Sequence, residues 1–582
     1  MRQFLRVLLI SSTGFLFTAC SEPSAPQAEQ PADNQQITPA DPIAGSPLFT
    51  EQEAAAANEI TGENLHAVVA EIADDRYQGR GPGSEGDEMA RQYLIQQMTA
   101  LGLQPGGDSG SWEQEFALVG INSAMPENWT FSTAAGEVNL AASEDYIATS
   151  GVQQATAQIN DAEVVFVGYG IQAPEFQWDD FKDVDVTGKV LLMLNNDPDW
   201  DPELFAGNTR LYYGRWMYKY ESAARQGAAG AIILHTTPSA AYPWQVVQTS
   251  NTGEQFELPA VGEARTQVNA WLTEEATREM LTLAGFELDD LLEQARSRDF
   301  QPLPLGITTS LTLNNTISQK TSANVIGLLP GSDPLLASEA VIYSAHHDHL
   351  GMAEPTGEVG EDLIYNGALD NASGVAQVLE IARAFSALEQ APRRSVAFNF
   401  VGAEEQGLLG SEFYARNPTF PQGKIAANLN IDGGSIWGRT RDISYIGYGK
   451  SSLDDVVEAV AYIFGRTVSA DQFPDRGSFY RSDQFNFARI GVPAIFLRAG
   501  TDVIGKPAGW GVEQMNQFNE VDYHQPDDEL TDEWVFDGMI EDARINFLTG
   551  LLIANDPQLP AWNQGDEFEA ARLEALSNLN GN

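Results

Sequence analysis

Three of the six histidines in the chain lie within four consecutive positions, as His346, His347 and His349 with Asp348 between them. They directly follow residues 340–345, a mostly apolar run that predicts a buried strand of a parallel sheet. Open α/β sheets bind ligands just beyond the carboxyl ends of their strands. A histidine with a carboxylate two residues further on resembles a metal ligand held in place by a neighbour. A strand end can also carry histidines for hydrogen bonding, so this stretch alone leaves both interpretations open.

Further acidic and histidine residues follow, nearly all at the end of a predicted strand or in a turn. They are Asp370, Glu404, Glu405, Asp432 and His524. Because the carboxyl ends of parallel strands meet at one edge of a sheet, we expect these side chains to converge. An adjacent glutamate pair alone is usually surface charge. The whole series, in this order and at strand ends, predicts a metal site.

The donor types in this series narrow the choice of metal. Nitrogen and carboxylate ligands without sulfur suit Zn²⁺, with Co²⁺ or Mn²⁺ as substitutes. One catalytic zinc usually takes three protein ligands, so two histidines and three carboxylates are too many for it. They fit two ions about 3.5–4 Å apart that share one bridging carboxylate. One carboxylate of the pair Glu404 and Glu405 can then bind metal while the other stays free as a base.

The elements that position these residues alternate between strands and helices. Strands are predicted at 341–345, 395–401, 424–430 and 492–497, and helices or helical turns at 374–388, 410–415, 452–464 and 483–490. A last helix is expected near 533–554, and two helices open the folded region between about 50 and 101, joined by a glycine-rich turn at 77–84. This order predicts an α/β fold with a mostly parallel, twisted sheet and helices on both faces.

Between about 145 and 318 the sequence changes character. Strands are predicted at 163–170, 188–194 and 231–234, with a helix at 215–226, and no histidine–acid cluster with ligand spacing occurs. We expect an inserted, β-rich, non-catalytic domain. Its segment 223–235, AARQGAAGAIILH, resembles a protease-associated domain.

The order of the motifs, concentrated between residues 322 and 530, resembles the zinc aminopeptidases of peptidase family M28, specifically bacterial members with a protease-associated insert. The resemblance extends over roughly residues 60–555 and implies a zinc exopeptidase-like fold. It implies these roles: His346 and Asp432 bind one metal, Glu405 and His524 bind the other, Asp370 bridges them, Asp348 orients His346, Glu404 is the general base and Tyr523 donates to the oxyanion. A cis peptide bond after Asp370 is also implied, and no ligand position is missing.

The resemblance implies an aminopeptidase that hydrolyses N-terminal residues from peptides with a water bridged by two zinc ions. Phe479 and Phe485, in a segment that matches the substrate-pocket loop of the family, would suit an apolar first side chain. Three alternatives stay open. Arg481 could bind a substrate carboxylate, as in a carboxypeptidase or dipeptidase of this fold; a glutaminyl cyclase would use a single zinc; and a non-enzymatic binding protein could be built around the insert.

Composition limits the partners. The net charge is −50 and the pI is near 4.2, which disfavours nucleic acid and anionic membrane surfaces because like charges repel. With 582 residues, two or three domains are expected. Peptide substrates remain the expected partners, with membrane association only through a lipid anchor.

That anchor is expected at the N-terminus, where Arg2 and Arg6 precede an apolar run at 7–17 and then the single cysteine, Cys20. A basic start, a short apolar core and a small residue before the break predict a secretory signal. Residues 17–20 resemble a bacterial lipobox, with a plain signal peptide as the alternative. We expect an exported protein, lipid-anchored in the outer membrane or facing the periplasm.

Together these observations predict six segments: a lipoprotein-type signal peptide at 1–20, a flexible tether at 21–48, the N-terminal part of the peptidase domain at 49–144, the protease-associated insert at 145–318, the peptidase catalytic domain at 319–560 and an acidic tail at 561–582.

Lipidation at Cys20 is directly testable. Radiolabelled palmitate should be incorporated into the wild-type protein in a bacterial host and should be absent from Cys20→Ala, because the thiol is the only attachment point in the chain. Gel autoradiography of both proteins reads this out. A wild-type band without label would mean that the segment is a plain signal peptide.

Overall fold

The computed structural model describes residues 42–202, 204–353, 355, 357 and 360–580. Residues 42–582 form one compact unit. The predicted signal peptide, most of the predicted tether and Cys20 lie outside the described residues, and the domain boundaries predicted within the compact unit stay predictions. No helix in the described part of the chain is long and apolar enough to cross a membrane.

Four parallel strands form the centre of the predicted α/β sheet. In spatial order they are β17 (Ser395–Val401), β14 (Ala340–His346), β18 (Ile425–Asn430) and β21 (Ala494–Ala499). Antiparallel neighbours extend both sides, β13 (Leu303–Leu329) beside β17 and β19 (Asp442–Ile446) beside β21, with β20 (Thr467–Ala470) parallel to β19. The fold is a mixed α/β fold with a parallel centre, which confirms the predicted fold class.

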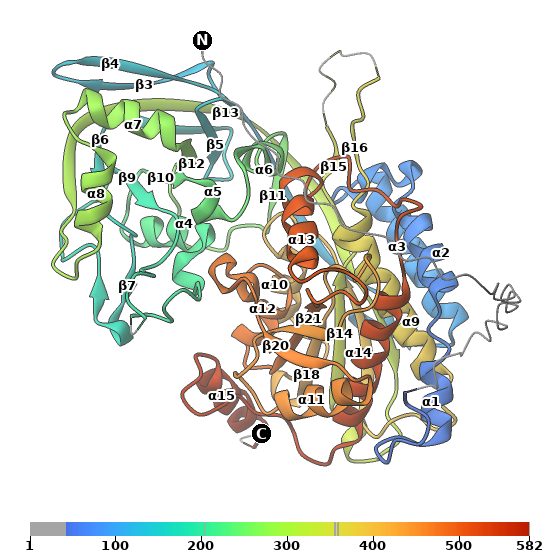
Figure 1. The fold of residues 1–582 in the computed structure, drawn as a ribbon. Coiled ribbons are helices and arrows are strands. Elements are labelled where there is room, and N and C mark those ends of the chain that lie inside the picture. Colours follow the sequence, from blue (N-terminus) through green and yellow to red (C-terminus); the bar gives the residue numbers. More distant parts are fainter. Residues whose placement is uncertain (1–41, 203, 354, 356, 358–359, 581–582) are drawn as a thin grey trace, which may run out of the picture. The chain divides into compact units, whose positions relative to one another are not determined.

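Successive side chains of the central strands point to opposite faces, and helices cover both. On one face, Tyr343 and Phe398 pack against α2 (Gly62–Ile72), α9 (Ser373–Ser386) and α14 (Asp537–Asn555), which Figure 1 shows side by side. On the other, Ile342 and Ala397 pack against α10 (Leu409–Arg416) and α12 (Gln484–Arg489). Both layers are apolar, so the central strands are buried on both faces.

The N-terminal helices complete the first layer. These are α1 (Glu51–Ala57) and α3 (Glu85–Ala100), whose apolar residues join the same core as α2. All three helices have an N-cap residue whose side-chain oxygen accepts a hydrogen bond from a free main-chain N–H in the first turn. The N-cap residues are Thr50 for α1, Thr61 for α2 and Ser84 for α3. Asp87, in the first turn of α3, is thereby held in a fully buried position.

A second set of strands lies in the region predicted as an insert. β6 (Thr156–Phe166), β9 (Val190–Leu194), β10 (Gly230–His235) and β12 (Val268–Thr273) are parallel, and β5 (Tyr146–Ser150) is antiparallel to β12. They have their own hydrophobic core with α7 (Glu274–Leu283) and α8 (Leu288–Ala295). The long strand β13 joins the two regions, since its first half pairs with β6 and its second half with β2 (Glu113–Ala124).

Some elements were not predicted. α13 (Trp510–Val521) has only one buried residue, Gly511. Because the helix buries almost no apolar side chain, its sequence lacks the helical spacing of apolar residues that would predict it. α15 (Glu569–Asn580) lies in the segment predicted as a charged tail, yet Arg572 there is buried and donates to the main-chain carbonyl of Ile425. The short strands β19 and β20 were also missed.

The contact between α14 and β14 predicts a large cost for one added methyl group. A Cβ at Gly550 would lie 1.8 Å from Tyr343 Oη, which donates to the carbonyl of Asn546 at 2.8 Å inside the core. Gly550→Ala should lower the free energy of unfolding by about 1–3 kcal/mol, measured by denaturant or thermal unfolding.

Gly62→Ala is the matched control, since its added Cβ would make only ordinary contacts at 3.4 Å in another helix. That variant should be neutral or up to about 1 kcal/mol more stable. Equal unfolding midpoints for the two variants would contradict the packing described here.

Candidate metal centre

The ends of three adjacent parallel strands bring the predicted ligands to one edge of the sheet. His346 is the last residue of β14, Glu404 and Glu405 follow β17, and Asp432 follows β18. Asp370 lies in the short turn η6 (Ala368–Ala372), directly before α9. His524 comes from the loop after α13. The elements therefore converge as the sequence predicted.

Two histidines face the two oxygens of one carboxylate. His346 Nε2 lies 3.1 Å from Asp370 Oδ1 and 3.6 Å from Asp432 Oδ1. His524 Nε2 lies 3.4 Å from Asp370 Oδ2 and 3.0 Å from Glu405 Oε2. Asp370 is thus shared by two groups, each with one histidine and one further carboxylate. The structure brings together all five residues predicted as metal ligands.

Glu404, the predicted general base, borders this cluster. Its Oε2 lies 4.0 Å from His346 Nε2, and the residue is only 8% exposed. Ligand atoms of Glu404, His346 and Asp432 lie within 4.8 Å of one another. Burial, together with the neighbouring carboxylates of Glu405 and Asp432, raises the pKa of Glu404 well above its usual range, although His346 opposes the shift.

The turn that carries Asp370 is held by a residue that sequence reasoning missed. Asp528 accepts hydrogen bonds from the main-chain N–H groups of Leu369 at 2.8 Å and Asp370 at 3.0 Å. The peptide bond between Asp370 and Asn371 is cis, as the family resemblance implied. Only the position of Asp528, four residues after His524, could have drawn attention to it.

Asp348 contacts His346 through a different atom from the one expected. We expected the Asp348 carboxylate to orient the imidazole, but the main-chain carbonyl of Asp348 lies 3.2 Å from His346 Nδ1. The carboxylate instead accepts hydrogen bonds from the main-chain N–H groups of Glu404, at 3.0 Å, and Glu405, at 3.4 Å. The carboxylate therefore holds the loop after β17 against the end of β14.

The other two histidines of the opening motif have hydrogen-bonding roles. His347 Nε2 lies 2.9 Å from Asp87 Oδ1, which ties α3 to the end of β14. His349 Nδ1 lies 2.6 Å from Glu405 Oε1, on the oxygen that does not face His524. Neither belongs to the two groups around Asp370.

Arg80 was also missed by sequence reasoning. Its fully buried guanidinium donates to the main-chain carbonyls of His347, Asn366 and Gly367, at 2.6–3.0 Å, and to that of Ile72. It thereby fixes the segment after β14 and the segment before Asp370 with one side chain. The sequence placed Arg80 in a glycine-rich turn and offered no signal of this role.

The charges of the cluster fit bound cations. Burial alone would raise the pKa of Asp370, but His346 and His524 outweigh it and lower that pKa well below its usual range. The pKa of Glu405 is lowered to about 2, since His524 and His349 outweigh its burial. His524 Nε2 is buried and has no hydrogen-bond partner within the described residues, although it points at two carboxylates. A nitrogen lone pair between carboxylate oxygens is the donor set of a zinc site.

Tyr523 is positioned to donate a hydrogen bond into the site. Arg481 Nη2 donates to Tyr523 Oη at 3.3 Å, and the Tyr523 ring stacks on His524 at 3.9 Å. Burial raises the pKa of Tyr523, with the Arg481 charge opposing, so the phenol stays protonated and its O–H is free for a ligand.

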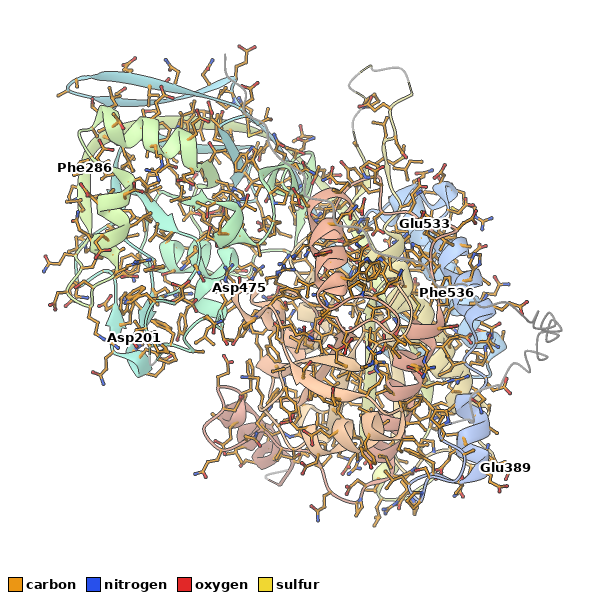
Figure 2. All side chains as sticks on the ribbon, viewed as in Figure 1. Asp201, Phe286, Glu389, Asp475, Glu533 and Phe536 are labelled. Atoms are coloured by element: carbon orange, nitrogen blue, oxygen red, sulfur yellow. The ribbon has the colours of Figure 1, made fainter. Side chains whose placement is uncertain are left out.

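The cluster lines one side of a pocket of about 270 Å³. Asp370, Glu404 and Tyr523 line it, together with Phe473 and Arg476 from the segment 471–482. Asp475, in the same segment, is labelled in Figure 2. The other side comes from the region predicted as an insert, including Arg215, Trp216, Tyr242, Val246 and Trp271. The insert was predicted to be non-catalytic, yet its side chains help to form the pocket.

The insert also contacts a predicted ligand directly. Ser250, the last residue of α6 (Trp244–Ser250), has its Oγ 2.8 Å from His524 Nδ1. If Nε2 uses its lone pair for a metal, Nδ1 carries the proton and donates to Ser250. Sequence reasoning could not find this pair, because its members are 274 positions apart.

The strand ends of this α/β fold place two histidines and two carboxylates around one shared aspartate. This arrangement is typical of proteins with a histidine–carboxylate metal centre. Residues 324–542 match the model of peptidase family M28. The match covers the central strands and every predicted ligand.

Individual proteins are similar over parts of the chain. Leupeptin-inactivating enzyme 1 of Streptomyces exfoliatus is 30% identical over 230 residues, which is 39% of this chain and 47% of the relative. Aminopeptidase NAALADL1 of Mus musculus is 33% identical over 141 residues, 23% of this chain and 17% of the relative. The chain thus spans less than half the length of these curated relatives.

A solved structure shows the same fold. The aminopeptidase from Aneurinibacillus sp. strain AM-1 is similar with a TM-score of 0.51, covers 87% of this chain and 97% of its own, and is 18% identical.

The Ser250 contact predicts an effect of the insert on metal affinity. Ser250→Ala should weaken metal binding about 10–100-fold, because residues that orient a ligating histidine typically contribute that much. Titration of the metal-free protein with Zn²⁺ by calorimetry, or competition with a chelator, measures it.

Thr249→Ala is the control, since the Thr249 hydroxyl bonds only to carbonyls of its own helix. Zinc affinity should be unchanged in this variant. A Ser250→Ala protein that binds zinc as tightly as Thr249→Ala would remove the orienting role.

Proposed function

We propose that the protein is a metal-dependent exopeptidase, and specifically an aminopeptidase that removes N-terminal residues from peptides. The observation that carries the proposal is the shared position of Asp370, with Oδ1 facing His346 and Oδ2 facing His524. The match of residues 324–542 to the model of peptidase family M28 supports hydrolysis of peptides. One curated relative and the similar solved structure bear the name aminopeptidase, which supports the choice of peptide end.

The cluster would hold two divalent ions, Zn²⁺ by donor type. His346, Asp370 and Asp432 would bind one ion, and Asp370, Glu405 and His524 the other. When bound, the ions would supply Lewis-acid chemistry, lowering the pKa of a water from 15.7 to about 7 and polarising the peptide carbonyl. The second histidine beside Asp370 favours two ions over the single zinc of a glutaminyl cyclase.

Glu404 would move the protons of the reaction. Its carboxylate is buried next to the ligand cluster but is not needed in either group around Asp370. It would accept a proton from the attacking water and deliver it to the amine nitrogen as the peptide C–N bond breaks.

Tyr523 would stabilise the charge that develops on the carbonyl oxygen. Its O–H can donate because its oxygen already accepts a hydrogen bond from Arg481. A donor fixed in advance, in a site shielded from water, stabilises an oxyanion without reorganising during the reaction.

Metal counting and a substrate panel test the proposal. Plasma emission on the purified full chain should find two zinc ions per chain. Chromogenic aminoacyl substrates should be cleaved, whereas the same compounds with blocked amino groups should not. One ion per chain would favour the cyclase alternative, and cleavage of only N-blocked peptides would favour a carboxypeptidase.

Glu404→Gln separates proton transfer from metal binding. The variant should keep both metals and lose turnover by about 10²–10⁴-fold, since general acid–base catalysis contributes that much. kcat on an aminoacyl substrate and metal content on the same sample measure the two effects. Turnover close to wild type at full metal content would refute the role of Glu404.

Asp370→Ala is the comparison variant, because it removes the residue shared by both groups. This protein should lose metal as well as activity. Full metal occupancy in Asp370→Ala would count against a bridging position.

A further inference from the structure

Arginines gather in the pocket of a strongly acidic protein. Arg215 directly precedes α4 (Trp216–Arg225), and Arg481 follows the short turn η9 (Ser478–Tyr480). Both line the pocket together with Asp370 and Glu404. Arg210 lies behind them, where its main-chain N–H donates to the carbonyl of Pro474. We name Arg210, Arg215 and Arg481 the arginine cluster. With 32 basic against 82 acidic residues, three neighbouring arginines would ordinarily find acidic partners.

Two members of the cluster are buried and have guanidinium nitrogens that make no hydrogen bond within the described residues, although the charge of the buried Asp197 acts on Arg210. Arg215 is 6% exposed, and its Nε has no hydrogen-bond partner within the described residues. Arg210 is 2% exposed, and none of its three guanidinium nitrogens has a partner there. Removing a charge from water without a partner costs several kcal/mol, so buried arginines are normally paired. An anion that enters the pocket would supply the missing partner for Arg215.

Arg481 connects the cluster to the metal centre. Its guanidinium lies over the rings of Tyr242, at 5.4 Å, and Tyr523, at 6.0 Å, and donates to Tyr523 Oη. Tyr523 in turn stacks on His524. Tyr523 therefore contacts both Arg481 and the predicted metal ligand His524. A small ligand is long enough to reach from the arginine cluster to the metal centre.

The electrostatics agree with this arrangement. The pKa of Arg215 is lowered to about 9, first by burial and next by the charge of Arg481. The other pocket arginines differ. Arg476 donates to Asn516 Oδ1 at 2.6 Å and lies over Phe473, and Arg498 is exposed. Among the described arginines that line the pocket, only Arg215 is buried and has a guanidinium nitrogen without a hydrogen-bond partner.

We propose that Arg215 and Arg481 bind a carboxylate of the peptide substrate, so that the protein selects short or acidic peptides. The carboxylate is either the C-terminal group of a short peptide or an aspartate or glutamate side chain close to the scissile bond. A guanidinium is suited to it because its planar N–H groups bind a carboxylate through two parallel hydrogen bonds. This inference rests on the proposed peptidase function, which supplies the substrate that bears the carboxylate.

Binding measurements on metal-loaded Glu404→Gln test the proposal without turnover. Calorimetry would measure the affinities of two pairs of peptides. The first pair is a dipeptide and its C-terminal amide, and the second is a peptide amide that ends in Glu and the same amide ending in Gln. All four carry the N-terminal residue that the substrate panel selects. The first pair reports the terminal carboxylate and the second the side chain. In at least one pair the carboxylate should bind about 10–100-fold more tightly, as for charge-assisted hydrogen bonds. Equal affinities within both pairs would overturn the proposal.

Arg215→Gln assigns the effect to the cluster. In this variant the affinity ratio between acid and neutral peptide should fall at least ten-fold, and in the turnover enzyme the loss should lie in KM rather than kcat. Arg498→Gln is the matched control, since it removes an exposed arginine of the same pocket. Its ratio should stay within three-fold of wild type. An equal loss in both variants would indicate a general positive field and overturn the site.

The outcomes separate this inference from the proposed function. If the metal-loaded wild type hydrolyses no peptide but Glu404→Gln still prefers the acids, the peptidase proposal fails and the carboxylate site stands. If peptides are hydrolysed with equal kcat/KM for acid and amide in both pairs, the peptidase proposal stands and the carboxylate site fails. The comparison of acid and amide peptides on the wild type uses no variant of the arginine cluster. It therefore tests the proposal even if Arg215→Gln folds poorly.

Discussion

Burial of several carboxylates at one edge of the sheet is the constraint on which the rest of the site depends. Asp348 and Asp483 are fully buried and Glu404 nearly so, close to Asp370 and Glu405. Burial raises the pKa of Asp348 to about 8 and that of Asp483 to about 7. Asp370 and Glu405 have lowered pKa values, because histidines outweigh their burial. The fold therefore divides its carboxylates into those that keep their charge beside a histidine and those that are driven towards protonation.

Holding such a cluster together requires a frame of donors that do not move. Main-chain N–H groups satisfy Asp348 and Asp528, and the single guanidinium of Arg80 joins the segment after β14 to the one before Asp370. Asp87 and His347 connect α3 to the same strand end. The helices at the N-terminus are thus part of the frame of the site, although they contribute none of its predicted ligands. An unpaired donor or acceptor at this depth costs more than a made bond contributes, so each of these residues is tightly constrained.

The sequence predicted the central strands and the ligand cluster because both depend on local pattern. Runs such as residues 395–401 are apolar on both faces, which only a covered parallel strand explains, and parallel strands end at a common edge. The contact made by Asp348 could not be predicted, since the choice between its carboxylate and its carbonyl depends on where the loop after β17 lies. Ser250 and Arg215 carry no local signal at all. Their importance arises from His524 and Tyr523, which lie more than 270 positions further along the chain.

The sheet edge and the region predicted as an insert contribute different groups to the pocket, and this has a consequence for any short peptide that enters. The cluster around Asp370 would hold the metal ions that act on the scissile bond, whereas Arg215 and Arg481 would attract a carboxylate. Positive charge in a cleft with low-dielectric walls draws in a ligand of opposite charge. A short peptide whose carboxylate is bound there would lie with its other end towards the metal centre. The insert, which supplies Arg215, would then determine the direction and the length of the substrate, while the catalytic sheet determines the bond that is broken.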